Sequence, residues 1–264
     1  MEKKAILERA DVRSGFRSGV RAGSGAGSVA ANIDSGLRAH MLSVFAHMAA
    51  AMVVSGVVSG VFGHDLIALM SAVPGAAAPT YLPSQFVSAI YAPPIIYAVM
   101  FAPLVMVMFF SRTAASPATA AAFLMAFAAV MGASLGTVVA TYTAMSVATA
   151  FFAASAAFLS AAIVGYTTRV NIAPMGSFLM MGVFGLIAGS IVNLFLGAPA
   201  LSFAISALTV LIFSALTAWD MQRIKVSYLV SPEAPPPAAA SALGLYINFV
   251  NIMLALLNLF GSRR

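Results

Sequence analysis

The chain has 264 residues, of which 62% are hydrophobic and 8% are charged, and its mean hydropathy is +1.01. About a quarter of the residues of a soluble domain are charged, so this composition excludes a soluble domain and predicts a membrane protein. The absence of cysteine excludes disulfides and thiolate metal sites. We expect the lipid bilayer as the main partner, and no nucleic acid.

The first 38 residues are hydrophilic and contain seven Lys and Arg against four Asp and Glu. They do not fit a signal peptide, because the apolar core of a signal peptide follows its charged start much sooner. Residues 14–28 are rich in Gly, Ser and Arg, which is typical of a flexible linker. We therefore divide the chain into a basic, flexible cytoplasmic tail (residues 1–38) and a membrane domain (residues 39–264).

Seven apolar stretches follow the tail, and each is long enough to cross about 30 Å of hydrocarbon as a helix. The pattern predicts an all-α, polytopic membrane protein with a seven-transmembrane-helix bundle. The predicted spans are residues 39–62, 88–110, 117–140, 143–166, 174–196, 200–220 and 241–261.

Loop cations predict the orientation of this bundle. Arg112, Arg169 and the pair Arg223 and Lys225 fall in alternate loops, whereas the other loops between spans contain no Lys or Arg. All these cations share a side with the basic tail, which the positive-inside rule makes cytoplasmic. The N-terminus is therefore predicted to be cytoplasmic.

Two arginines after the last span, Arg263 and Arg264, do not follow this pattern, because a seventh full crossing places them outside. Either they are too few to matter, or the last segment is re-entrant. We favour a full crossing, since no Gly or Pro interrupts the segment between Gly244 and Phe260.

Small residues at four-residue spacing occur in several spans and predict close helix packing, because lipid provides no hydrophobic drive for helix association. The glycines that we assign to packing are Gly132, Gly136, Gly185 and Gly189.

Enzyme and cofactor sites lack the residues they need. Residues 132–136 read G-x-S-x-G, but a serine protease needs a base near its nucleophile, and His47 is the only histidine inside a span. The lysines lie in the tail and in the sixth loop, which excludes a retinal Schiff base within the bundle. We expect neither an enzyme nor a resident cofactor.

Polar residues near the last two spans remain. Asp220 lies at the predicted cytoplasmic end of its helix, where a salt bridge with Arg223 or Lys225 would account for it. Asn248 and Asn251 share one face of the last helix. This polar face indicates either interhelical hydrogen bonds or a path for ions or protons.

Five segments resemble the Bax inhibitor-1 family, also called the transmembrane Bax-inhibitor-motif family, and are closest to its bacterial branch. The resemblance covers roughly residues 34–264 and rests on GLRAHML (36–42), MGASL (131–135), GSFLMMG (176–182), TAWDMQRIK (217–225) and LYINFVN (245–251).

The resemblance implies a pH-sensitive calcium leak channel whose sensor is a pair of aspartates on the last two helices, with an arginine nearby. Asp220 matches the first aspartate, Asn248 stands at the position of the second, and Arg112 is the candidate arginine. Asp220 and Asn248 are therefore the candidate Ca²⁺ ligands, with Asn251 as a neighbour and Ca²⁺ as a transient permeant ion. Because an amide does not titrate, we expect a blunted pH sensor.

The alternative is a non-transporting regulator that binds another membrane protein, such as a membrane-anchored protease, through residues 1–38. Both readings imply a multi-pass protein of the bacterial inner membrane.

Overall fold

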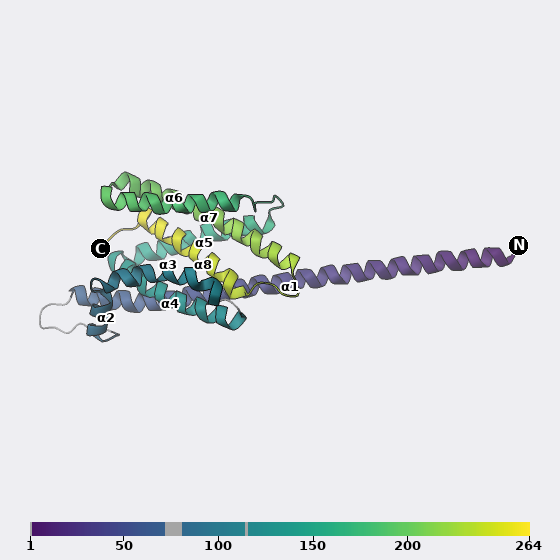
Figure 1. The fold of residues 1–264 in the computed structure, drawn as a ribbon, viewed down its shortest axis with the longest axis horizontal. Helices are drawn as coiled ribbons and strands as arrows, with labels where there is room; N and C mark the ends of the chain where they lie inside the picture. The colour runs from purple at the N-terminus through teal and green to yellow at the C-terminus, as the bar shows by residue number, and fades with distance from the viewer. Residues whose placement is uncertain (1, 72–80, 114–115) are drawn as a thin grey trace.

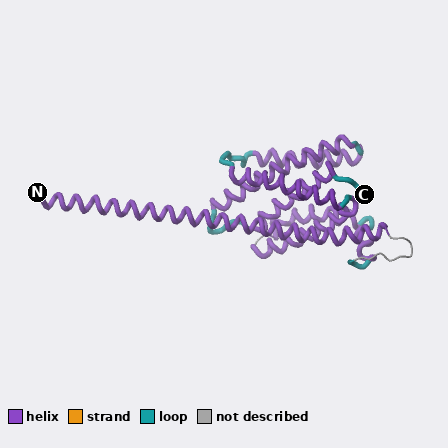
Figure 2. The backbone as a smooth tube through the Cα atoms, turned by 180° about the vertical axis from the view of Figure 1, so that it is seen from behind, coloured by secondary structure: helices purple, strands orange, loops and turns teal. Residues whose placement is uncertain are grey.

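The computed structural model describes the backbone of residues 2–71, 81–113 and 116–264, and the side chains of residues 34–71, 81–109 and 116–264. These residues fold into helices connected by short loops (Figure 2). The helices are α1 (Glu2–Ser71), α2 (Ser84–Tyr91), α3 (Ile95–Thr113), α4 (Pro117–Thr141), α5 (Ala144–Thr167), α6 (Met175–Leu196), α7 (Pro199–Val230) and α8 (Ala238–Phe260).

The predicted all-α membrane fold is confirmed. Among the described residues, six helices are long and apolar enough to cross a membrane, and α2 with α3 forms a seventh candidate bent by 71°. Pro93 and Pro94 lie at this bend. Proline lacks the backbone N–H of a helical residue and disfavours helix in the residue before it, so the second predicted span, 88–110, is divided between two helices.

Two other helices extend further than predicted. The first predicted span ends at residue 62, whereas α1 continues to Ser71. The sixth ends at Asp220, whereas α7 continues to Val230, so its last turns extend past the apolar stretch. Hydropathy marks where a helix leaves the hydrocarbon but not where its backbone hydrogen bonds end, which explains both differences.

The N-terminal part of α1 projects beyond the bundle (Figure 1). The backbone is helical through residues 14–28, where the composition predicts a flexible linker. The side chains of residues 2–33 lie outside the described ones. The division of the chain at residue 38 therefore stays a prediction.

Local sequence sets the short connections between helices. Ser116 caps α4 by accepting a hydrogen bond from the backbone N–H of Thr119, and Pro117 occupies the first turn, where a missing N–H costs nothing. Thr143 caps α5 in the same way. Gly197 ends α6 at a φ of 60°, which glycine adopts without steric cost. Short connections of this kind reverse the chain direction between α4 and α5 and between α6 and α7, and the second pair also packs together.

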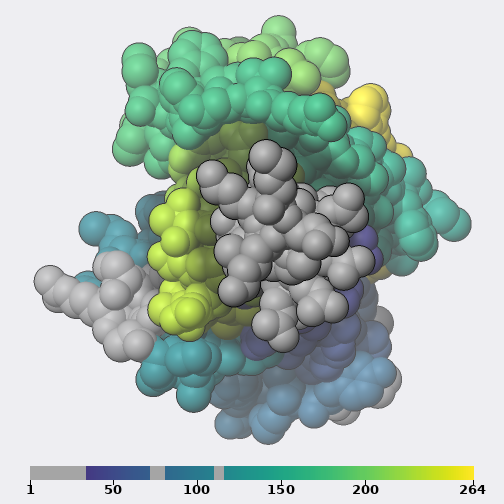
Figure 3. All heavy atoms as spheres, turned by 90° about the vertical axis from the view of Figure 1, so that its right-hand side faces the viewer, coloured from purple at the N-terminus to yellow at the C-terminus, as the bar shows by residue number. Residues whose placement is uncertain are grey.

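Helix α8 is the centre of the bundle. It contacts α1, α4, α5 and α7, and 56% of its most apolar window is buried, against 11% for α6. Viewed end-on, the green atoms of α6 lie at the top of the molecule and the blue atoms that include α2 lie at the bottom (Figure 3). Helix α6 packs mainly on α7, so most of its apolar surface is left for lipid.

The C-terminal residues meet the turn between α4 and α5. The backbone N–H of Arg264 donates to the carbonyl of Thr141, and that of Thr143 donates to Ser262. Helix α4 ends at this turn, so α8 runs in the same direction as α4. The end of α8 therefore lies at the opposite end of the helix from the α7–α8 loop, residues 231–237. This geometry agrees with the full crossing that the sequence favours; which face is cytoplasmic stays a prediction.

The four packing glycines differ in their surroundings. A Cβ on Gly132 would lie 2.7 Å from the Ser55 carbonyl oxygen, so α4 approaches the α1 backbone closely there. A Cβ on Gly136 would lie 3.0 Å from the Phe62 Cβ and closer still to the Tyr91 hydroxyl. Gly189 has ordinary contact distance to its neighbour on α7. Nothing lies within 4 Å of a Cβ on Gly185, so the predicted packing role does not extend to it.

We predict that Gly132→Ala lowers the thermal unfolding midpoint of the purified protein, whereas Gly185→Ala does not. The added methyl group meets the backbone of Ser55 in the first case, and overpacking of this kind costs about 1–3 kcal/mol. Circular dichroism melting in one detergent measures both variants. Equal midpoints for the two variants would contradict this account of the α1–α4 contact.

Candidate functional site

Asp220 lies inside α7, ten residues before its end, and not at a helix terminus as the sequence predicts. The helix dipole therefore does not act on this carboxylate in the way expected, because its effect is confined to the last turn. Only 13% of the side-chain surface is exposed. An acid that is this far removed from solvent requires partners within the bundle.

The main partner is Asn248 on α8. Its Nδ2 donates a hydrogen bond of 2.8 Å to Oδ2 of Asp220, and the Asn248 residue is 5% exposed. Gly244, one turn earlier on α8, lies against the same carboxylate, since a Cβ there would be 3.5 Å from Oδ2. The two residues that the family resemblance pairs are thus in direct contact, and the contact joins α7 to the central helix.

The second oxygen of Asp220 faces outward. Its Oδ1 lies 4.0 Å from the guanidinium of Arg223, one turn later on α7. The Arg223 side chain is 63% exposed and lies over the Trp219 ring at 4.9 Å. An ion pair of this length and exposure contributes little. The amide of Asn248 is therefore the contact that holds the carboxylate inside.

The polar face of α8 does not form a continuous path. Asn251 donates 2.8 Å to the carbonyl of Ile247 in its own helix, and Asn258 accepts a 3.2 Å bond from the Tyr142 hydroxyl near the end of α8. Of the asparagines on this face, Asn248 alone contacts Asp220 among the described residues. Asn251 is therefore a neighbour along the helix but not a partner.

The predicted arginine, Arg112, lies on α3, and its side chain is outside the described residues. Helix α3 packs against α4 and α2. A pairing of Arg112 with Asp220 stays a prediction.

A permanent metal site is not formed by the residues that the structure describes, since no three His, Asp or Glu side chains cluster there. Asp220 and Asn248 are also predicted Ca²⁺ ligands, and they provide carboxylate and amide oxygen, which hard cations prefer. Binding of Ca²⁺ at this pair stays a prediction.

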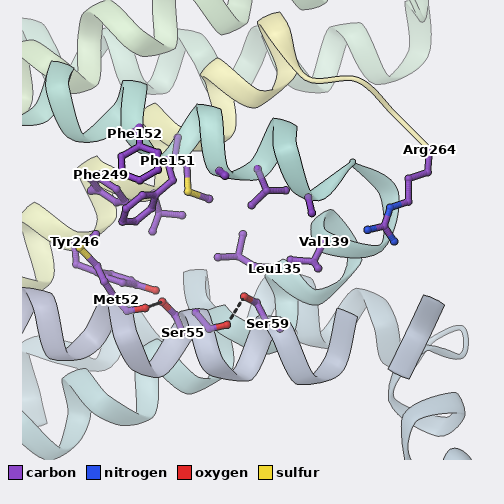
Figure 4. Close-up of a pocket in the computed structure, with 17 residues that line it drawn as sticks. Met52, Ser55, Ser59, Leu135, Val139, Phe151, Phe152, Tyr246, Phe249 and Arg264 are labelled. Atoms are coloured by element: carbon purple, nitrogen blue, oxygen red, sulfur yellow. Dashed lines mark hydrogen bonds between the residues drawn. The ribbon is translucent and has the colours of Figure 1, made fainter. Parts of the chain in front are cut away.

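A cavity of about 400 Å³ opens on the other side of α8 (Figure 4). It lies between α1, α4, α5 and α8, with Arg264 and Tyr246 at opposite ends (Figure 4). The walls are mostly apolar, and the polar exceptions on α1 are Ser55 and Ser59. The sequence does not predict that the small residues of α1 line a cavity. Their four-residue spacing is the one sequence signal that could have indicated a shared helix face.

Tyr246 forms the inner end of the cavity and is fully buried. Its hydroxyl points toward Ser55 but does not meet hydrogen-bond geometry with it (Figure 4), and no other partner lies among the described residues. The Ser55 hydroxyl instead donates to the Met52 carbonyl at 3.1 Å. A buried hydroxyl without a well-formed hydrogen bond is costly, so this atom is the least satisfied polar group of the cavity wall.

A second buried acid, Asp65, was not predicted from the sequence. Asp65, near the end of α1, is fully buried and accepts hydrogen bonds from the backbone N–H groups of Tyr81 (2.9 Å) and Leu82 (2.8 Å). His64 also contacts it at 3.2 Å. Asp65 therefore ties the segment before α2 to the end of α1, which is a structural role.

Comparison with known proteins gives the family. A family model described as "Inhibitor of apoptosis-promoting Bax1" matches residues 37–264. The chain belongs to the Bax inhibitor-1 family. This match contains all of α2 to α8, and with them Asp220 and Asn248, but it begins after most of the N-terminal projection of α1.

The chain is similar to several bacterial proteins. An uncharacterized protein of Caulobacter vibrioides is 46% identical over 177 residues, 65% of this chain and 71% of the relative. The inner membrane protein YbhL of Escherichia coli K12 is 32% identical over 145 residues, 53% of this chain and 62% of YbhL. The apolar helices and this relative's name support the predicted location, a multi-pass protein of the inner membrane.

We predict that Asn248→Ala destabilises the protein more than Asn251→Ala does. The first change leaves the Asp220 carboxylate without its 2.8 Å donor, which costs about 1–3 kcal/mol, whereas the second removes a bond within one helix. Thermal unfolding in detergent compares the two variants.

A double-mutant cycle of Asp220→Ala and Asn248→Ala gives the coupling between them, expected above about 0.5 kcal/mol for residues in contact. Additive effects would show that the hydrogen bond does not contribute to the fold.

Proposed function

We propose that this Bax inhibitor-1 protein is a calcium leak channel of the inner membrane, closed by the contact between Asp220 and Asn248. The observation that supports this proposal is the 2.8 Å hydrogen bond that joins the acid of α7 to the central helix α8. An ionisable residue that faces the interior of a membrane bundle is a functional candidate by default, because keeping it there is costly.

The cavity supplies one half of a route to this contact. Tyr246 ends the cavity, and Asn248 lies two residues further along α8 on roughly the opposite side of the helix. The body of α8 therefore lies between the cavity and the acid. In the proposed opening step, α8 shifts away from α7, the Asn248 amide leaves Asp220, and a Ca²⁺ ion takes its place beside the carboxylate.

Asn248 changes the expected pH response of the channel. Two aspartates in contact share a proton, because both cannot ionise cheaply, and protonation then switches the pair. An amide keeps one hydrogen-bonding state at every pH and always donates to Asp220 in the closed form. The opening of this channel is therefore proposed to depend on pH more weakly than that of a channel with two aspartates.

We predict that Asp220→Asn lowers Ca²⁺ flux by about tenfold or more, because the permeating cation loses its carboxylate partner inside the bundle. Asn251→Ala, on the same helix face as Asn248, should leave the flux within about twofold, since Asn251 bonds to its own helix. Asn248→Asp should steepen the pH dependence of flux. Proteoliposomes that contain a Ca²⁺ indicator measure all four proteins at several pH values.

No flux above that of empty liposomes in any of these proteins would reject the channel. Equal flux from the wild type and Asp220→Asn would reject the role of the carboxylate. Monodisperse gel filtration of each variant shows whether a loss of flux reflects a loss of folded protein.

We also predict that Tyr246→Phe reduces Ca²⁺ flux several-fold without lowering the unfolding midpoint. Among the described residues the hydroxyl has no well-formed hydrogen bond to lose, but it is the polar group that faces the inner end of the cavity. Tyr91→Phe is the matched control, because its hydroxyl donates 2.7 Å to the Ala133 carbonyl and contributes about 1 kcal/mol to stability. If Tyr246→Phe conducts as the wild type does, the cavity is not part of the route.

A non-transporting regulator is the second candidate, and the projection of α1 beyond the bundle favours it (Figure 1). Most of this projection precedes the family match, so it is a feature that the Bax inhibitor-1 domain does not require. Deletion of residues 2–33 separates the two candidates. A channel should retain its flux after this deletion, whereas a regulator should lose its protein partner.

A further inference from the structure

Helices α1 and α5 both pack on α8 but make little contact with each other. A groove of about 580 Å³ separates α1 from α5. It lies beside residues 38–45 of α1 and the last turns of α5. Its size lies within the range of about 300–1,000 Å³ that is usual for ligand sites. The groove walls are apolar and come from Met41, Leu42 and Phe45 on α1 and from Leu159 and Ile163 on α5, with Met221 of α7 beside them.

The walls of this groove face the lipid. Leu42 is 70% exposed and Ile163 is 62% exposed, so no other part of the described chain covers them. From Arg38 to Phe45 the groove follows α1 over seven residue steps, a height of about 10 Å at 1.5 Å per step. This height corresponds to the upper part of one acyl chain within a leaflet about 15 Å thick.

Two cations lie at or beside the groove. Arg38 of α1 lines it and is exposed, and within the described part of the chain it forms no ion pair, not even with Asp34 one turn earlier. Lys225 of α7 donates 2.9 Å to the carbonyl of Tyr166, a residue that also lines the groove, and lies 5.0 Å from the centre of its ring. The apolar groove thus has the exposed cation Arg38 in its wall and a second cation, Lys225, beside the lining residue Tyr166.

This combination matches an anionic phospholipid. Arginine binds phosphate with two parallel hydrogen bonds, and basic pockets between transmembrane helices are typical sites for anionic headgroups. The acyl chain would fill the slot between Leu42 and Ile163, and the phosphate would lie at Arg38. A zwitterionic lipid fits the slot equally well but has no net negative charge to match the two cations.

We propose that the groove between α1 and α5 binds an anionic phospholipid of the leaflet on the side of the N-terminus, with Arg38 as the phosphate ligand. The lipid fixes the distance between α1 and α5, which are otherwise held together only through α8 and its neighbours. This site is independent of the channel function proposed above.

The test uses the full-length protein in detergent with added phosphatidylglycerol, phosphatidylcholine or inorganic phosphate. Native mass spectrometry counts bound lipid, and the unfolding midpoint reports stabilisation. We expect phosphatidylglycerol to bind and to raise the unfolding midpoint by several degrees. Phosphatidylcholine should bind with an affinity at least about fivefold lower, and inorganic phosphate should leave the midpoint unchanged.

Two variants and a control assign the site. Arg38→Gln should weaken phosphatidylglycerol binding about fivefold or more through loss of the charge. Ile163→Trp should weaken it by filling the slot, at an exposed position where the larger ring is tolerated. Arg169→Gln, which removes an exposed arginine beyond α5 that does not line the groove, should bind as the wild type does.

Equal losses in Arg38→Gln and Arg169→Gln would show only a general attraction of anionic lipid to basic residues and would overturn the proposal. Equal binding of phosphatidylcholine would overturn it as well. An equal midpoint shift with inorganic phosphate would assign the cations to a free anion instead of a lipid.

Discussion

The burial of α8 is the constraint on which the rest of the structure depends. A helix at the centre of a membrane bundle must satisfy its polar groups against other helices, because neither water nor lipid can do so. Leu245, Tyr246 and Ile252 are fully buried on different faces of α8, so the surrounding helices must match it on several sides at once. The positions of α1, α4, α5 and α7 follow from this one requirement.

Small residues make this arrangement possible. Gly132 lets α4 approach α1, and Gly165 lets α5 reach the backbone of α7 at Ala218. In lipid, helix association relies on such close packing, since apolar side chains gain little by leaving the membrane. Where small residues do not bring helices together, as between α1 and α5, the space is left open as the cavity and the groove described above.

Sequence predicted the spans well because hydropathy is a local property of each segment. Hydropathy did not predict helix ends that are fixed by hydrogen bonds to distant parts of the chain. The amphipathic end of α7 beyond Asp220 remains helical because Gln222 bonds to the backbone at Val170 and Ile172 and Lys225 bonds to Tyr166. These partners are about 50 to 60 residues away in the sequence, so no local pattern indicates them.

Some residues of the candidate site could be predicted from the sequence and others could not. The pair of Asp220 and Asn248 could be named from the family resemblance, because the motifs fix their positions on the last two helices. Tyr246 and Asp65 could not, since their importance comes from a cavity and from a distant backbone segment. A tyrosine in an apolar helix and an aspartate at a helix end are both unremarkable until their surroundings are known.

The replacement of an aspartate by Asn248 alters the balance of forces between α7 and α8. Two carboxylates attract only while they share a proton, so their contact weakens as the proton leaves. The amide donates to Asp220 whether or not other protons are present, and no like charge opposes it. Under the proposed function, closure depends less on protonation than in a pair of aspartates, because Asp220 is the one member of the pair that can still titrate. Hydrogen bonding and the packing of α8 against its neighbours then carry more of the closed state.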